Sequence, residues 1–429
     1  MESLLLFGIF FVGVFLSIPI GIAIGVAIIA YVFITGNIDF TYIIGGMFTA
    51  CDSFPLIAIP FFILSGTLME GGGLSKRLVN FFDSLVGQFA GGLSIVTVVA
   101  CLFFGAISGS GPATVAAIGT IMVPTMIEKG YDKKFAMALV AAAGCLGVII
   151  PPSIPMVMYG VSANASISTL FSAGFLPGIL CGLALIIISI ILCKKLGYKG
   201  NGLKFSIRRV GTRFKEAIWA LLVPVIILGG IYGGFFTPTE AAVIAVVYAF
   251  IIGFFVYKEL TPSVCYSKFA DAAKTTGSTI IIVATGTILG RVLTMEGVPQ
   301  SVAEGLLGIS ENKIVVLLLL NGLLLICGCL LETTSAILIL APILYPIAGS
   351  VGVDIIHFGI IMVVNLAIGF ITPPVGVNLF VSCAIGNVRF EQLVKSIIPF
   401  LIALLVGLMV ITFWPDMVLF IPRLMGYAG

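Results

Sequence analysis

Apolar segments follow one another along almost the entire chain, separated by short polar or charged stretches. The first, from Leu4 to Ile34, contains no charged residue. It exceeds both the ~20 residues that span a bilayer and the apolar core of a signal peptide, so we expect a retained membrane helix and no cleaved signal. Further spans are expected at 168–193, 216–234, 238–257, 276–295 and 395–420. The pattern predicts an all-α polytopic membrane protein.

Two apolar regions repeat each other at a fixed spacing. Pro124, Asp132, Gly147 and Pro151 return 222 positions later as Pro346, Asp354, Gly369 and Pro373. Each copy carries a Pro-Pro pair, within GVIIPPSIP and GFITPPVGV, so we expect broken membrane helices at 132–163 and 354–386. A helix break at membrane depth is tolerated where protein or a watery cavity satisfies the backbone. Paired breaks therefore indicate a transport site.

Composition excludes a soluble globular protein, because 60% of the residues are hydrophobic, only 9% are charged, and the mean hydropathy is +1.27. The nine cysteines lie mostly in apolar runs and are expected as free thiols.

The net charge is +3. Eight basic residues lie between 194 and 215, namely Lys194, Lys195, Lys199, Lys204, Arg208, Arg209, Arg213 and Lys215. We place this loop in the cytoplasm by the positive-inside rule and expect no nucleic-acid partner.

With this loop in the cytoplasm, two pairs of apolar segments each begin and end on the same side of the membrane, so we predict that they are re-entrant hairpins. The first is at 91–128 with the tip GAISGSGPAT, and the second is at 312–348 with the tip GCLLETTSA. The span 216–234 supplies the odd crossing that inverts the second copy. We therefore predict two inverted-topology repeats, each with one hairpin and one broken helix, a design that permits alternating access. The predicted divisions are 1–193, the basic loop with its connecting helix at 194–237, and 238–429.

Hydroxyl and glycine residues gather at the tips and breaks, where hydroxyl and carbonyl oxygens suit Na⁺. We predict two sodium sites related by the repeat. Their candidate residues are Ser108, Ser110, Gly147 and Pro151 in the first copy, and Gly328, Thr333, Thr334, Gly369, Thr372 and Pro373 in the second. The alternative is that these small residues only permit close helix packing.

An anionic substrate is expected, because half-helices that begin after Gly111 and Glu332 point their positive ends inward. The candidates to orient it are Ser153, Tyr159, Asn365 and Asn378. Arg291 is an intramembrane charge that either serves function, snorkels, or pairs with Glu296. Glu332 either has a role that is confined to the second half or is a solvated charge at the hairpin tip. Glu240 is interpreted as part of a helix-capping box.

A membrane-embedded enzyme is disfavoured. The only histidine, His357, is expected near the outer face, whereas Ser108 and Ser110 belong to the opposite hairpin. The sequence contains no cluster typical of a zinc site, and we expect no organic cofactor.

The motifs FFGAISGSGPATVAAIG (103–119), GGIYGGFFTPTEAA (229–242), the two Pro-Pro breaks, and MEGGG (69–73) with its echo MEGV (295–298) resemble one family. They are similar to the large membrane subunit, the DctM or SiaM type, of tripartite ATP-independent periplasmic (TRAP) transporters, within an ion-transporter superfamily. The resemblance covers essentially the whole chain. It implies an elevator mechanism and Na⁺-coupled uptake across the bacterial inner membrane. Two or more sodium ions are expected from the two tips.

The resemblance also implies partners. A periplasmic binding protein delivers a carboxylate, and a small membrane subunit of about four helices is expected as a separate chain. Sialic acid is the favoured substrate, with a C4-dicarboxylate as another. A stand-alone sodium/carboxylate symporter, a channel and a receptor-like scaffold remain as other readings of the residues.

Overall fold

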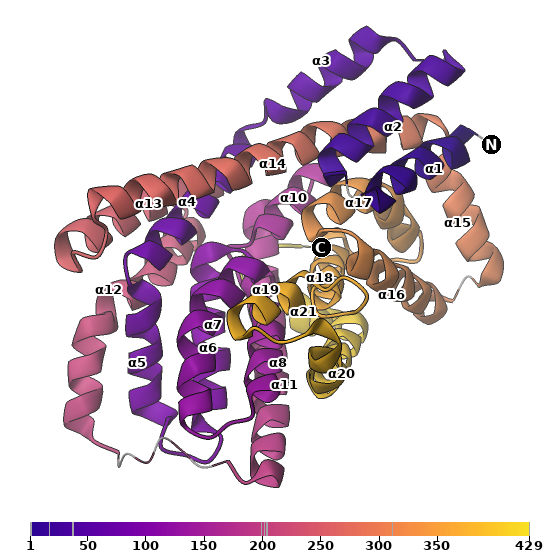
Figure 1. Ribbon diagram of the computed structural model, residues 1–429. Helices are drawn as coiled ribbons and strands as arrows, with labels where there is room; N and C mark the ends of the chain where they lie inside the picture. Colours follow the sequence, from indigo (N-terminus) through magenta and orange to yellow (C-terminus); the bar gives the residue numbers. More distant parts are fainter. Residues whose placement is uncertain are drawn as a thin grey trace.

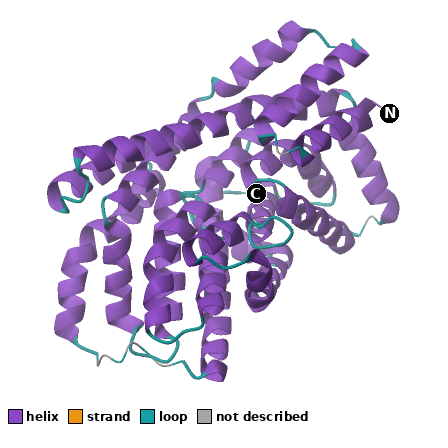
Figure 2. Cartoon of the chain, viewed as in Figure 1, coloured by secondary structure: helices purple, strands orange, loops and turns teal. Residues whose placement is uncertain are grey.

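The computed structural model describes residues 2–16, 18–36, 38–198, 200, 202, 205–310 and 312–428, and these form helices and loops without a β-strand (Figures 1 and 2). Within these residues, eight helices are long and apolar enough to cross a membrane, or nine if a bent pair counts as one span. The prediction of an all-α polytopic membrane protein is confirmed.

The helices fall into two series of similar order. The first series comprises α1 (Glu2–Phe15), α2 (Ile20–Thr35), α3 (Phe40–Cys51), η1 (Phe54–Ile57), α4 (Ala58–Gly71), α5 (Leu74–Val86), α6 (Gly92–Ser108), α7 (Gly111–Glu128), α8 (Lys133–Gly144), α9 (Leu146–Ile149), α10 (Ile154–Ser162) and α11 (Ile167–Leu196). After α12 (Ile207–Tyr232) come α13 (Pro238–Ile251), η2 (Ile252–Val256), α14 (Pro262–Met295), α15 (Val298–Ile309), α16 (Lys313–Leu330), α17 (Thr333–Ser350), α18 (Ile355–Gly369), α19 (Val377–Gly386), α20 (Phe390–Phe413) and α21 (Pro415–Leu424).

The two predicted hairpins are present as α6 with α7 and α16 with α17. Each second arm begins at an N-cap, Ser110 in α7 and Glu332 in α17, and these caps are 222 positions apart (332 − 110). Asp132 and Asp354 have the same separation and accept backbone hydrogen bonds at the starts of α8 and α18. The sequence repeat therefore fixes where corresponding helices begin, because each cap satisfies free N–H groups.

Both broken helices are present. In the first, residues 150–153 separate α9 from α10, with a bend of 42°. In the second, residues 370–376 separate α18 from α19. A proline lacks the N–H that would continue a helix, and each break contains two prolines in succession. The helix therefore ends near equivalent positions in the two halves.

Each half-helix that follows a break packs against helices of the opposite repeat. α10 packs against the second hairpin arm α17, and α19 packs against α7 and α8 of the first copy. The Tyr159 hydroxyl donates a hydrogen bond to the Ile355 carbonyl at 2.9 Å, and the Ser382 hydroxyl donates to Met137 at 2.9 Å. The two hairpins and two broken helices therefore form one interlocked block.

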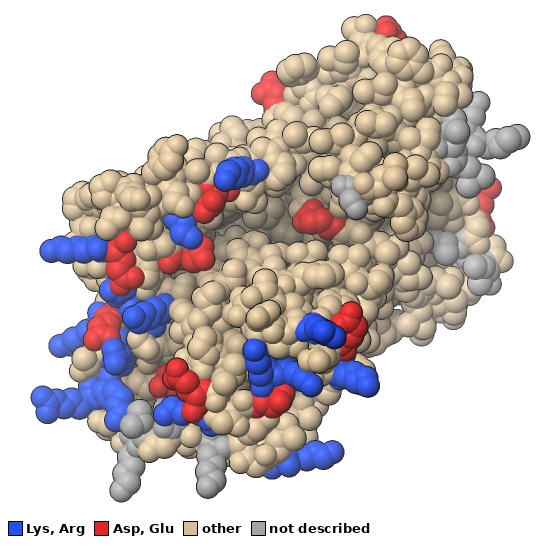
Figure 3. Space-filling view, in the orientation of Figure 1, with Lys and Arg blue, Asp and Glu red and all other residues tan. Residues whose placement is uncertain are grey.

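A second group of helices lies along this block. The long helix α14 packs against α2, α3 and α4, and α4 packs against α13 (Figure 1). The guanidinium of Arg77 in α5 forms a salt bridge with the carboxylate of Glu259 at 2.6 Å and lies 3.7 Å from the centre of the Tyr257 ring. These contacts connect α5 with the segment that precedes α14. Lys and Arg side chains gather at the end of the molecule near α5 and α12 (Figure 3).

Some predicted boundaries are wrong. Leu4–Ile34 is not one helix: α1 ends at Phe15, and α2 begins after Pro19, which fixes the backbone at the turn. Both ends of the basic segment 194–215 are helical, since α11 continues to Leu196 and α12 starts at Ile207 behind the N-cap Ser206. Lys199 and Lys204 of that segment lie outside the described residues.

Two further spans have different ends. The predicted helix 276–295 begins at Pro262, behind the N-cap Thr261, and the predicted helix 395–420 starts at Phe390 and is interrupted at Trp414. Thr237, Pro238 and Glu240 do form the capping box predicted for α13. The proposed divisions at 193 and 237 stay predictions.

Close backbone contacts hold each hairpin on its broken helix. A methyl group on Gly369 would lie 2.3 Å from the carbonyl carbon and oxygen of Gly328, and one on Gly105 would lie 2.6 Å from the Cα of Gly147. No side chain fits between these backbones. Glycine is therefore required at the crossing of the hairpin and the broken helix.

We predict that Gly369→Ala lowers the apparent melting temperature of the purified protein by several degrees, because overpacking against fixed backbone costs about 1–3 kcal/mol. Gly322→Ala is the matched control. Gly322 lies on hairpin helix α16 with open space around it, so alanine is expected to be neutral or slightly stabilising. Equal melting temperatures for Gly369→Ala and wild type would contradict the close contact.

Candidate functional site

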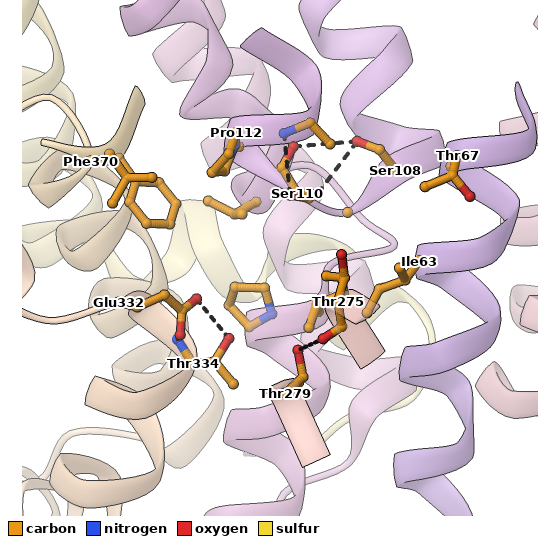
Figure 4. Close-up of a pocket in the computed structure, with 18 of the residues that line it drawn as sticks. Ile63, Thr67, Ser108, Ser110, Pro112, Thr275, Thr279, Glu332, Thr334 and Phe370 are labelled. Carbon is orange, nitrogen blue, oxygen red and sulfur yellow. Dashed lines mark hydrogen bonds between the residues drawn. The ribbon is translucent and has the colours of Figure 1, made fainter. Parts of the chain in front are cut away.

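A cavity of about 330 Å³ lies where the two hairpin tips meet the helices α4 and α14. This size suits a small organic molecule. Three groups of residues bring polar side chains to its lining: the first tip from Ser108 to Ala113, Glu332 with Thr334 of the second tip, and a face of α4 and α14 (Figure 4). Apolar residues beside the two breaks, among them Ile154 and Phe370, complete the lining. On the face drawn in Figure 3 the molecular surface is hollowed between α14 and the hairpin block.

Oxygen atoms cluster at the first tip. The Ser108 and Thr114 hydroxyl oxygens lie 3.1 Å apart, and Thr114 donates to the carbonyl of Ser110 at 2.7 Å. Ser108 and Thr114 are buried. Gly147 packs directly on this cluster, since a methyl group there would lie 2.4 Å from the Thr114 hydroxyl oxygen. The cluster offers three hard oxygen atoms within one turn of the tip.

The second tip has a different chemistry. Glu332 caps α17, accepting hydrogen bonds from the amides of Thr334 and Ser335 at 2.9 and 3.2 Å and from the Thr334 hydroxyl at 2.9 Å. The hydroxyl oxygens of Thr333 and Ser335 are buried and have no hydrogen-bond partner among the described residues. Buried hydroxyls are normally paired, so this tip has unused oxygen ligands.

The third wall was missed by the sequence analysis. Thr67 and Glu70 of α4 line the cavity together with Thr275, Ser278 and Thr279 of α14. Figure 4 shows Thr67, Thr275 and Thr279 of this wall. The available signal was the polar run TTGST at 275–279, which precedes the apolar residues of the same helix. Glu70 is held by Lys268 at 2.9 Å, which joins α4 to α14 at the cavity edge.

The ten predicted sodium ligands are distributed unevenly. Ser108 and Ser110 line the cavity, as does Thr334. Gly147 lies inside the short helix α9, so the break begins three residues later than expected, and Gly147 packs closely on the first tip. Pro151 and Pro373 lie in the breaks, Gly328 packs on Gly369, and Thr372 donates back to the carbonyl of Ile368. Thr114 and Ser335, whose hydroxyls lie at the same two tips, were not among the ten.

The four candidate substrate residues do not come together in the cavity. Ser153 caps α10 and donates to Val148, Tyr159 donates to Ile355, and Asn365 donates to Asn321. None of these three lines the cavity. Asn378 donates to the carbonyl of Ala141, and its own side-chain oxygen, which has no hydrogen-bond partner within the residues that the structure describes, lies against Gly111 at the first tip.

Other singled-out residues lie elsewhere. The ring of His357 is bonded to the carbonyl of Ile411 at 2.9 Å, outside the cavity lining. Glu296 accepts a hydrogen bond from Tyr31, and no ion pair joins it to Arg291 in the described part of the chain. The guanidinium of Arg291 lies beside Gly46 of α3.

Comparison with known families gives one match along nearly the full length. Residues 7–417 match the model of the tripartite ATP-independent periplasmic transporter, DctM component. The chain is 49% identical to the isethionate TRAP transporter permease protein DctMQ of Oleidesulfovibrio alaskensis, over 97% of this chain and 65% of that relative. It therefore spans less than two thirds of that protein.

Other relatives match over most of both chains. The C4-dicarboxylate TRAP transporter large permease protein DctM of Pseudomonas aeruginosa is 43% identical over 89% of each chain. The sialic acid TRAP transporter large permease protein SiaM of Vibrio cholerae is 38% identical over 96% of this chain and 97% of that one. The crystal structure of the YdaH transporter of Alcanivorax borkumensis shares the fold, with a TM-score of 0.63, 15% identity and 88% coverage of both chains.

Proposed function

The chain belongs to the DctM component family of TRAP transporters, and on this premise we propose that it carries out Na⁺-coupled uptake of a small organic anion across the bacterial inner membrane. The observation that carries the proposal is the single cavity enclosed by both hairpin tips and by α4 and α14. The cavity joins the interlocked hairpin block to the helices around it. A substrate bound there touches both parts at once.

Two sodium sites follow from the tips. In the first, the hydroxyls of Ser108 and Thr114 and the Ser110 carbonyl supply oxygen ligands. In the second, the hydroxyls of Thr333 and Ser335, which have no partner in the described part of the chain, are the corresponding ligands. Sodium bound at either tip would order it against its broken helix. The binding of the ion and the closing of the cavity are thereby coupled.

The transported anion is delivered by a periplasmic binding protein, and a small membrane subunit completes the transporter. The family and the names of relatives support these partners. Those names include isethionate, C4-dicarboxylate and sialic acid, so the relatives support an organic anion without choosing one. The basic end of α11 and α12 is placed in the cytoplasm by the positive-inside rule.

Movement is expected to follow an elevator mechanism. The hairpins and broken helices pack across the repeats as one block, whereas α4 packs on both α13 and α14 outside it. The Glu70–Lys268 and Arg77–Glu259 pairs fasten this outer group together. A rigid block sliding against a fastened scaffold would expose the cavity to each side in turn.

The proposal predicts uptake driven by sodium. The chain is reconstituted in liposomes with its small subunit, the binding protein is added outside, and labelled anion is followed after a sodium gradient is imposed. Accumulation above the outside concentration is expected only with the gradient and the binding protein together. Uptake without the binding protein would indicate a stand-alone symporter, and equilibration indifferent to the gradient would indicate a channel.

We predict that Thr114→Val raises the sodium concentration for half-maximal uptake by roughly tenfold or more, because an interaction with a charged partner is worth about 1.5–3 kcal/mol. Valine keeps the shape and removes the hydroxyl. Thr120→Val is the matched control on the same helix, since Thr120 is exposed and its hydroxyl donates to the carbonyl of Ala117. An unchanged sodium dependence in Thr114→Val would remove the first site.

A further inference from the structure

We propose that Glu70 and Glu296 are positioning residues, which fix the scaffold ends of the two connections through which the hairpin block moves. The inference rests on the proposed function and deepens it by naming the fixed points of the movement. It starts from the repeated sequence Met-Glu-Gly, which occupies 69–71 and again 295–297. The first copy lies at the end of α4, and the second lies at the end of α14.

A short helix follows each copy of the motif and leads to a hairpin. α5 begins at Leu74 and packs against α6 of the first hairpin, whereas α15 begins at Val298 and packs against α17 of the second. The backbone turns into these helices at Gly73 and Gly297, whose φ values of +76° and +68° favour glycine. Each connection therefore has one end on a scaffold helix and the other on the hairpin block.

Both glutamates occupy a place where the helix itself gains nothing from a carboxylate. The C-terminal end of a helix carries partial negative charge, so a carboxylate is disfavoured there. Glu70 is the residue before the last in α4, and Glu296 is the C-cap of α14. The same unfavourable residue at both ends indicates that the carboxylates serve contacts outside their own helices.

Each carboxylate is bonded to a different scaffold helix. Glu70 of α4 pairs with Lys268 of α14 at 2.9 Å. Glu296 accepts a hydrogen bond from the hydroxyl of Tyr31 in α2, and Tyr31 is fully buried. Packing of α14 on both α4 and α2 supports these bonds. The scaffold end of each connection is thus held by a helix other than the one that ends there.

The long helix α14 takes part in both bonds and joins them (Figure 1). Lys268 and Glu296 are 28 positions apart (296 − 268), which corresponds to about 42 Å of helix. A bilayer with its headgroups is about 40–45 Å thick. α14 is therefore long enough to place the two fixed points near opposite membrane surfaces, as inverted repeats require.

A connection turns the sliding of the block into its own rotation only if its scaffold end stays in place. When one of the bonds is lost, the helix end can follow the block, so part of the movement is absorbed before the cavity changes sides. The cavity lining is unaltered, since it contains none of Tyr31, Lys268 and Glu296. Loss of either bond is therefore expected to slow transport without weakening the binding of ion or anion.

The test measures turnover per binding site in liposomes with the small subunit, the binding protein and a sodium gradient. The probe is whichever of labelled isethionate, succinate and N-acetylneuraminate wild type accumulates, and maximal uptake is divided by the number of sodium-dependent anion-binding sites in the same sample. Tyr31→Phe removes the hydroxyl and keeps the ring. Its turnover is expected to fall about fivefold, the value of one typical hydrogen bond, with unchanged half-saturating sodium and anion concentrations. Lys268→Met is expected to do the same at the first motif.

Three further variants separate the bond from general damage. Glu296→Ala is expected to match Tyr31→Phe, and the double variant to be no slower than either, because the same bond is lost in all three. Glu296→Gln keeps an acceptor oxygen and is expected to retain the wild-type turnover. Tyr248→Phe is the matched control with wild-type turnover, since the Tyr248 hydroxyl donates to the carbonyl of Trp219 at 2.8 Å and joins α13 to α12.

Unchanged turnover per site in Tyr31→Phe or in Lys268→Met would overturn the inference while the proposed function stands. A loss of binding sites that accounts for the whole loss of uptake would do the same, because the bonds would then serve folding alone. If wild type accumulates none of the three anions under the sodium gradient, the proposed function itself is wrong.

Discussion

The structure depends on satisfying the backbone where two helices break inside an apolar protein. Each break leaves N–H and C=O groups without helical partners, and such groups are costly in a medium without water. At the first break the amide of Ile154 donates to the carbonyl of Gly109 in the neighbouring hairpin tip, and the Ser153 hydroxyl donates to Val148. At the second, Asn378 donates its amide to Phe370 and its side-chain NH₂ to Ala141 of the first copy. The first break therefore depends on the first hairpin tip, and the second break depends on a helix of the opposite repeat.

This requirement explains why the site lies between the halves. A hairpin tip can satisfy a break only if the backbones approach closely, which glycines at 105, 147, 328 and 369 permit. The same approach brings hydroxyls of both tips to one cavity. The repeat is not exact in chemistry, because Ser110 and Glu332 cap equivalent helices with a hydroxyl and a carboxyl group. The architecture is shared between the halves, whereas the polarity of the site is not.

Much of the fold was predictable because its signals are local. Pro-Pro pairs end helices, Asp132 and Asp354 begin them, and the 222-residue spacing relates the two copies. The break within the first apolar segment was missed although Pro19 marks it, since total apolar length was weighed above a single proline. Helix ends inside the basic segment were also missed, because charge indicates sidedness and does not exclude helix.

The site was predicted in part. Hydroxyls at the tips were identified from the repeat, but Thr67 and Thr275 became visible only when α4 and α14 were placed against the tips. Asn365 and Tyr159 are polar and close to the breaks in sequence, yet their side chains bond to neighbouring helices. The direction in which a side chain points from a buried helix depends on packing partners that are distant in the sequence. The spacing of residues along the sequence alone does not predict this direction.

The central claim is that the two halves enter the membrane in opposite directions. Glu128 and Ser350 are exposed, end the helices α7 and α17, and are 222 positions apart (350 − 128). Glu128→Cys and Ser350→Cys, each on a background without native cysteines, are treated with a membrane-impermeant thiol reagent in right-side-out and inside-out vesicles. The account predicts labelling of Glu128→Cys only from the cytoplasmic side and of Ser350→Cys only from the periplasmic side. Labelling of both from the same side would contradict it.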